Sequence, residues 1–189
     1  MSVYLASASD SLKVWEIDAN STVSLKSESH VYAEGLSAMS WNHTNQVVAV
    51  GGQSTQVSLV QASNGHVLST IPFNDNTDVV SYTHNITCLN FSSNSRYIVV
   101  GSDCNLHLWD LKRRQRKYIS PLTNKMITNC LFFPENNNNM NVNMNGVNGD
   151  VICADTDGSI YIWDVKYKSP LSEMKYEHKS AINTLGMMM

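Results

Sequence analysis

The chain has 189 residues, of which 42% are hydrophobic and 15% are charged, and its net charge is −3 at pH 7. This length can support a domain with a real core, and the slightly acidic composition gives no general attraction to nucleic acid or to anionic membranes. Because the sequence has neither an apolar run of membrane-spanning length nor the profile of a signal peptide, we expect a cytoplasmic protein without a membrane partner.

Apolar and polar residues alternate with period two through most of the chain, which predicts strands, and no stretch has a sustained helical period. A first group of three strands is expected at about 3–7, 12–17 and 22–27. A second group of four is expected at about 36–41, 47–51, 57–60 and 67–71. Clusters of Gly, Ser and Asn lie between these segments and predict tight turns.

The second half of the chain continues the pattern. A third group of strands is expected at about 86–91, 97–101, 105–111 and 117–120, and a fourth at about 127–132, 151–154, 159–165 and 171–176. One further strand is expected at 181–186. Residues 135–150 interrupt the fourth group and consist mostly of Asn with Met, Val and Gly, so we expect a disordered surface loop there.

These groups are copies of one repeat. Residues 106–111 read LHLWDL and residues 160–165 read IYIWDV, while KVWEI at 13–17 is a third copy and VSLV at 57–60 is a fourth that has lost its Trp. Aligned in this way, Trp15, Leu59, Trp109 and Trp163 are 44, 50 and 54 residues apart. A period just above 40 residues with four short strands is typical of a β-propeller blade.

The sequence therefore predicts an all-β propeller with about four blades of four antiparallel strands. Their expected boundaries are 3–30, 36–73, 84–122 and 126–178, followed by the extra strand at 181–186. The first blade lacks an inner strand and the last strand is surplus, so two arrangements are open. The surplus strand could complete blade one in a tight four-bladed ring, or it could begin another blade of an open, partial propeller. We favour the open propeller, because blades shaped for a larger ring are rotated less relative to their neighbours than a four-bladed ring requires.

The repeats resemble the WD-repeat family of β-propellers. In that family a strand Trp, a Ser or Thr, an Asp in the following turn and a His before the blade form a hydrogen-bonded structural network. The resemblance assigns this role to His84, Ser102, Asp103 and Trp109 in blade three, and to Asp157 and Trp163 in blade four, where Asp155 replaces the hydroxyl residue. A His, Asp and Ser set could also suggest acyl transfer, but no nucleophile elbow is present, so we expect no enzyme activity and no cofactor.

Cysteine and histidine spacing gives no metal signature, because no CxxC pair and no His cluster occurs. Three cysteines lie in expected strands and one lies in a turn, and we expect all four to be reduced thiols: Cys88, Cys130, Cys153 and Cys104. The remaining histidines are expected at surface or cap positions: His30, His43, His66, His107 and His178.

One charged cluster stands out in the expected turn between the third and fourth strands of blade three. Five cations occupy six positions there: Lys112, Arg113, Arg114, Arg116 and Lys117. A solvated turn without a partner would explain such a run. The functional alternative is a docking point for an acidic protein partner, such as a phosphorylated segment or a tubulin-like acidic surface. Nucleic acid is the weaker alternative, because only Tyr118 adds an aromatic ring.

Within the WD-repeat family, the chain is most similar to the centrosomal adaptors that recruit γ-tubulin ring complexes. The similar segments are ASASDSLKVW at 6–15, LSAMSW at 36–41, LWDLK at 108–112, WDV at 163–165, SP at 169–170 and HK at 178–179. This resemblance implies a protein-interaction scaffold of the centrosome or spindle, active in microtubule nucleation, with γ-tubulin complex or augmin-like partners. The chain departs from those adaptors in having about four blades instead of seven and no C-terminal helical region.

A second function remains open, that of a substrate receptor of a ubiquitin ligase. Such receptors often carry Trp-Asp-x-Arg at the end of the third strand. Here the fourth residue of that motif is Lys112 in blade three and Lys166 in blade four. A lysine cannot reproduce the forked donor geometry of arginine, which favours the adaptor interpretation.

Overall fold

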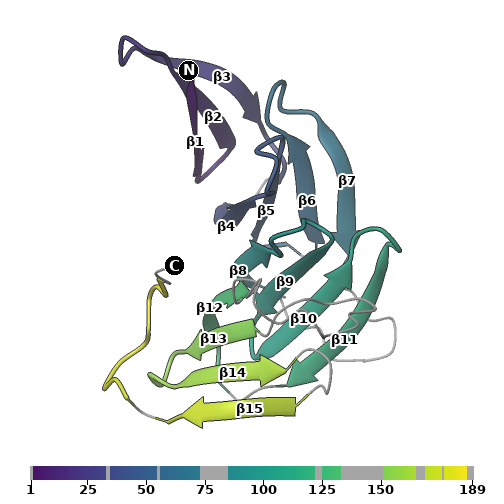
Figure 1. Ribbon diagram of the computed structural model, residues 1–189, viewed down its shortest axis with the longest axis vertical. Coiled ribbons are helices and arrows are strands. Elements are labelled where there is room, and N and C mark those ends of the chain that lie inside the picture. The colour runs from purple at the N-terminus through teal and green to yellow at the C-terminus, as the bar shows by residue number, and fades with distance from the viewer. Residues whose placement is uncertain are drawn as a thin grey trace, which may run out of the picture. The chain divides into compact units, whose positions relative to one another are not determined.

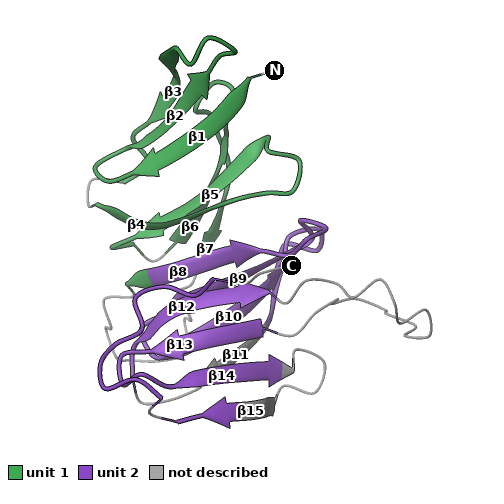
Figure 2. Cartoon of the chain, turned by 60° about the vertical axis from the view of Figure 1, so that its left-hand side comes forward, with its two compact units in different colours: residues 1–86 green, residues 87–189 purple. Residues whose placement is uncertain are grey.

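The computed structural model describes residues 2–32, 35–54, 56–72, 85–121, 125–132, 151–164, 169–175 and 177–186. Within these ranges the regular secondary structure consists of strands in four antiparallel sheets (Figure 1). The prediction of an all-β fold made of blade-like sheets is confirmed. The described residues contain no helix that could cross a membrane. The chain divides into two compact units, residues 1–86 and 87–189 (Figure 2).

Unit 1 contains blades one and two. Blade one has three strands, which are β1 (Val3–Ala8), β2 (Leu12–Ile17) and β3 (Val23–Ser29). Blade two has four strands, which are β4 (Leu36–Trp41), β5 (Val47–Gly52), β6 (Gln56–Gln61) and β7 (Val67–Pro72). Neighbours in the chain are neighbours in each sheet, because tight turns join antiparallel strands.

Unit 2 contains almost all of blade three and all of blade four. Blade three consists of β8 (Ile86–Phe91), β9 (Tyr97–Ser102), β10 (Asn105–Asp110) and β11 (Gln115–Pro121). Blade four consists of β12 (Ile127–Phe132), β13 (Val151–Asp155), β14 (Ile160–Asp164) and β15 (Ser169–Met174). Each of these fifteen strands lies within two residues of its expected position, whereas residues 181–186, expected as a further strand, form none. The insertion expected at 135–150 lies outside the described residues.

A β-bulge at the same place in every blade corrects the repeat alignment. The pairing between the third and fourth strands shifts between Val14 and Trp15 in blade one, and immediately before Trp109 and Trp163 in blades three and four. In blade two the shift falls between Leu59 and Val60. Val60 is therefore the counterpart of the tryptophans, and the alignment on Leu59 is wrong by one residue. Without a Trp, the VSLV segment has no side chain that fixes the register.

Each blade has two distinct faces. We call the face that bears Trp15, Val60, Trp109 or Trp163 the Trp face, and the opposite one the far face. In unit 1, the far-face residue Val14 of blade one shares a buried cluster with Val48, Val50 and Val60 from the Trp face of blade two. The far face of each unit's first blade thus packs against the Trp face of its second.

The same arrangement occurs in unit 2. Leu106 and Leu108 from the far face of blade three share a buried cluster with Val151, Tyr161 and Trp163 from the Trp face of blade four. Apolar burial of this extent is the main stabilising term for such stacked sheets. The repeat therefore specifies both the strands and the order in which their faces stack.

A recurrent backbone contact positions the first residue of the following inner strand. The amide of Leu36 donates to the Ser9 carbonyl at 2.6 Å, and the amide of Ile127 donates to the Asp103 carbonyl at 2.7 Å. The Ser9 carbonyl lies in the turn between β1 and β2, and the Asp103 carbonyl lies in the corresponding turn between β9 and β10. These bonds satisfy backbone groups that would otherwise be buried unpaired where one blade follows another.

The three buried cysteines of unit 2 give a test of this packing. Cys130 and Cys153 are 1% and 0% exposed, and burial raises the pKa of both thiols well above the usual value. Since the thiolate is the nucleophile, both should react with a thiol reagent at pH 8 at least about 100-fold more slowly than the partly exposed Cys104. Mass spectrometry of time-resolved labelling measures this difference. Equal rates for Cys130, Cys153 and Cys104 in the folded protein would contradict the packing, whereas equal rates in denaturant are expected.

Candidate interaction site

The five predicted basic residues lie in and just after the turn between β10 and β11. Lys112, Arg113 and Arg114 are exposed, whereas Arg116 and Lys117 at the start of β11 are half-buried. Arg114 adopts a positive φ of 53°, which closes the turn. The turn therefore presents its first three cations to solvent, while the strand holds the other two.

A buried carboxylate at the end of β10 fixes this turn by accepting hydrogen bonds. Asp110 ends β10 with a fully buried side chain, and its Oδ1 accepts a 3.0 Å hydrogen bond from the backbone amide of Arg113. Its Oδ2 accepts a 3.3 Å hydrogen bond from Nη2 of Arg96. Desolvation alone would raise the pKa of Asp110, but the Arg113 amide and the Arg96 guanidinium outweigh it and lower that pKa. The carboxylate is thus ionised at neutral pH and anchors the turn.

Arg96 also belongs to this site, although no sequence pattern pointed to it. It precedes β9, and its carbonyl accepts a 2.9 Å hydrogen bond from the Leu111 amide, which brings the β8–β9 turn next to the basic turn. Its guanidinium carbon lies 5.1 Å from the centroid of the Tyr97 ring. Arg96 thus joins the five predicted cations, and two of the six, Arg96 and Arg113, lie within 4.0 Å of the buried Asp110 carboxylate. The only sequence signal for Arg96 is its place one residue before β9. That place points to Asp110 only when the pairing of β9 with β10 is known.

The predicted structural residues of blade three lie as follows. Ser102 and Trp109 are buried, at 1% and 9% exposure, and both lie on the Trp face. Asp103 lies in the next turn with a positive φ of 48°, and His84 lies outside the described residues. His107 is only 4% exposed and lies between Trp109 and Ser102 along that face. The prediction of a surface or cap position for His107 is therefore wrong. The other four histidines given that prediction are exposed, namely His30, His43, His66 and His178.

In blade four the organising residue is Asp155. Its buried Oδ1 accepts 2.9 Å hydrogen bonds from the amides of Asp157 and Ser159, and its Oδ2 accepts a 3.1 Å bond from the Tyr161 hydroxyl. Burial and this carboxylate raise the pKa of Tyr161 to about 12. Asp157 forms a 3.0 Å ion pair with Lys125, while Trp163 is buried in the core. The carboxylate of Asp155 thus closes the turn between the second and third strands of this blade.

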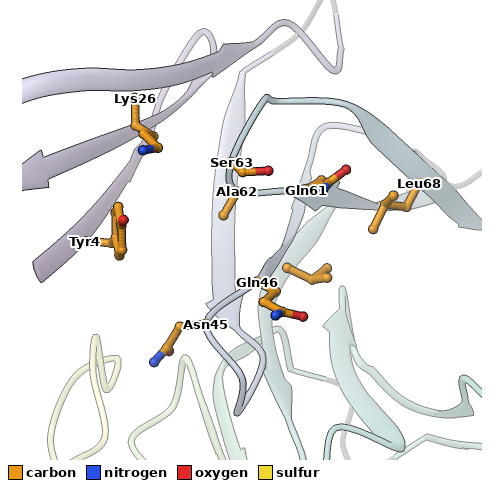
Figure 3. Close-up of a pocket in the computed structure, with 9 residues that line it drawn as sticks. Tyr4, Lys26, Asn45, Gln46, Gln61, Ala62, Ser63 and Leu68 are labelled. Carbon is orange, nitrogen blue, oxygen red and sulfur yellow. The ribbon is translucent and has the colours of Figure 1, made fainter. Parts of the chain in front are cut away.

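Unit 1 contains a pocket of about 450 Å³ between blades one and two (Figure 3). Tyr4 and Lys26 line it from blade one, and the blade-two side adds Leu68 and the side chains of Asn45, Gln46, Gln61 and Ser63. Lys26 is held by Glu16, with Nζ to Oε2 at 2.9 Å. The pocket is thus lined by amide side chains and by the exposed side chains of Tyr4 and Leu68, and its one lining cation, Lys26, is already paired with Glu16. Nothing in the repeat pattern predicted it.

Comparison with protein families identifies one repeat directly. Residues 76–110 match the family model described as WD domain, G-beta repeat. The match includes β8, β9 and β10 of blade three and ends at Asp110, directly before the basic turn. The chain therefore contains a WD repeat, in the blade to which the resemblance assigned four network residues.

Proposed function

We propose that this chain is a non-catalytic protein–protein interaction scaffold that docks an acidic partner on the basic turn of blade three. The observation that carries the proposal is the buried Asp110, which holds the turn in one conformation by accepting from the Arg113 amide and from Arg96. A preorganised cluster loses less conformational entropy on binding than a flexible basic tail. The WD repeat in this blade supports a scaffold, because such repeats serve typically as interaction modules.

The cellular role that we propose is that of a cytoskeletal or centrosomal adaptor in microtubule nucleation or spindle organisation. Its partners would be γ-tubulin complex or augmin-like components. Two observations support this step, namely the similarity of segments 6–15 and 108–112 to such adaptors and the complementarity between a basic turn and an acidic tubulin-like surface. A pulldown from cell extract tests the role, and recovery of cullin adaptors in place of γ-tubulin would contradict it.

Charge reversal on the turn is the direct test of the docking site. Lys112→Glu with Arg114→Glu should weaken binding of a glutamate-rich peptide at least about tenfold in a titration at low salt, since each reversal removes an attraction and adds a repulsion. Both side chains are exposed, so the fold should be unaffected. Wild-type binding should also fall steeply with ionic strength.

A matched control separates the site from net charge. Lys175→Glu with Lys179→Glu makes the same change in charge at exposed positions after β15, away from the basic turn in the sequence. This control should bind the peptide within about twofold of wild type, allowing only for screened long-range charge. If both double variants lose affinity equally, binding follows net charge and the proposed site is wrong.

A further inference from the structure

The pocket of unit 1 lies where two turns of blade two meet blade one. Residues 45–47 line it from the turn between β4 and β5, residues 61–63 line it from the turn between β6 and β7, and Leu68 adds a side chain from β7. Tyr4 on β1 and Lys26 on β3 lie on the opposite side (Figure 3). The pocket is therefore formed within one compact unit by two neighbouring blades.

Hydrogen bonds and a close backbone approach hold the walls of this pocket in place. The amide of Ala62 donates to the Gln46 carbonyl at 2.9 Å, which joins the two turns of blade two. The buried Ser27 hydroxyl of β3 donates to the Ala62 carbonyl at 2.8 Å. A methyl group at Gly65 would lie only 2.5 Å from the Glu28 carbonyl oxygen, so the turn also touches blade one directly. A preformed pocket of this kind loses little conformational entropy when a ligand binds.

The charge of the pocket is neutralised internally. Among the described residues that line it, only Lys26 is charged. Its Nζ donates to Oε2 of Glu16 at 2.9 Å and lies 5.7 Å from the centroid of the Tyr4 ring. The hydrogen bond from Lys26 lowers the pKa of Glu16, so both partners are ionised at neutral pH. An acidic ligand would have to compete with Glu16 for Lys26, and the pocket therefore favours an uncharged ligand.

The polar groups of the two turns suit a peptide backbone. Three carboxamides and one hydroxyl line this part of the pocket, namely Asn45, Gln46, Gln61 and Ser63. All are exposed except Gln61, which is half-buried, so a ligand can reach them. A carboxamide both donates and accepts hydrogen bonds, and so does each peptide group of an extended segment. Carboxamides can therefore pair with both kinds of backbone group.

Apolar surface in the pocket provides space for one side chain. Tyr4 and Leu68 are 43% and 49% exposed, and the half-buried Val47 lines the pocket between the two turns. The volume of about 450 Å³ lies in the range of about 300–1,000 Å³ that is usual for ligand pockets. Covering Tyr4 and Leu68 with an aliphatic group would remove apolar area from water and stabilise the complex.

We propose that this pocket is a second binding site, for an uncharged segment of a protein partner that inserts one aliphatic side chain. The inserted side chain lies between Tyr4 and Leu68. The carboxamides of Gln46 and Gln61 pair with the peptide groups on either side of it. This site goes beyond the proposed function, because the basic turn attracts negative charge whereas the pocket disfavours it. One chain can thus hold two partner segments of different chemistry.

Nuclear magnetic resonance titration of the ¹⁵N-labelled 189-residue chain tests the proposal. The probe is the neutral peptide acetyl-Gly-Leu-Gly-amide, which should cause saturable shifts of the backbone amides of Gln46, Ser63 and Leu68. Two matched peptides, with Glu or Gly in place of the central Leu, should bind at least about fivefold more weakly, because one adds a competing carboxylate and the other lacks the apolar group. Absence of saturable shifts, or equal affinity for all three peptides, would overturn the proposal.

Paired glutamine substitutions test the role of the carboxamides. Gln46→Ala with Gln61→Ala should raise the dissociation constant of the leucine peptide at least about fivefold. Gln53→Ala with Gln56→Ala is the matched control, since these side chains have the same exposure classes and lie at the opposite end of blade two, around the turn between β5 and β6. The control should stay within about twofold of wild type. Equal losses in both double variants would contradict the assigned contacts.

A final variant tests the charge selectivity and its independence from the basic turn. Glu16→Gln frees Lys26 and should strengthen binding of the glutamate peptide at least about fivefold at low salt. An unchanged affinity would show that the Lys26–Glu16 pair does not set the preference. Lys112→Glu with Arg114→Glu, which should impair the basic turn, should leave binding of the leucine peptide unchanged. A loss in that variant would show that the pocket is not a separate site.

Discussion

Replacing Trp109 with alanine is expected to lower the free energy of unfolding of unit 2 by about 3–5 kcal/mol. Trp109 is 9% exposed on β10, a strand paired on both sides, and lies opposite Ile98, which is fully buried. Removal of the indole would leave a cavity. Because β10 is hydrogen-bonded to a strand on each side, the backbone cannot easily move to fill that cavity. For a unit of this size, the loss should lower the midpoint of thermal unfolding by roughly 10 °C or more.

Trp15→Ala provides the comparison at the same blade position. Trp15 is only half-buried, and its indole Nε1 donates a 3.0 Å hydrogen bond to the exposed Ser7 hydroxyl. Because less apolar area is lost, the free energy of unfolding is expected to fall by only about 1–2 kcal/mol. Chemical denaturation of both variants measures the two values. A Trp109→Ala variant that unfolds within about 0.5 kcal/mol of wild type would show that Trp109 does not support the core of blade three.

The strands could be predicted because each leaves a local signal. Period-two alternation and the repeated Trp place β10 and β14 without tertiary information, and turn residues limit their ends. Blade two shows where this reasoning fails. With Val60 in place of Trp, both Leu59 and Val60 fit the apolar pattern, and only the bulge between them shows which one faces blade one.

The site was predictable only where its residues are contiguous. The basic run at 112–117 is visible in the sequence, but its anchor depends on Arg96, which strand pairing brings to Asp110 from 14 positions away. His107 shows the same difficulty, because a histidine in an otherwise apolar strand gives no sign of whether its face will be covered. Asp155 was recognised as a departure from the family pattern, yet its role required the positions of the amides that it accepts from.

Substitution of Gly158 by alanine is the second change from which a large effect is expected. Gly158 has a φ of +84° in the turn that Asp155 closes, a conformation in which other residues are strained. A methyl group there would overlap the carbonyl oxygen of His178 and would lie 2.9 Å from that of Ser180. Both oxygens belong to backbone, so relief requires movement of segment 177–182. We expect a loss of about 2–4 kcal/mol in the stability of unit 2.

The same substitution should release the C-terminal segment before it unfolds the core. The amide of His178 donates to the Gly158 carbonyl at 3.3 Å, and four residues later the amide of Ile182 donates to Asp155. Displacement of the first contact should therefore weaken the second, and hydrogen exchange at the Ile182 amide should accelerate more than exchange within β13. Gly186→Ala is the matched control, because no atom lies within 4 Å of a methyl group at that position. If Gly158→Ala left exchange at Ile182 as slow as in this control, the position of segment 181–186 on blade four would not depend on the turn at Gly158.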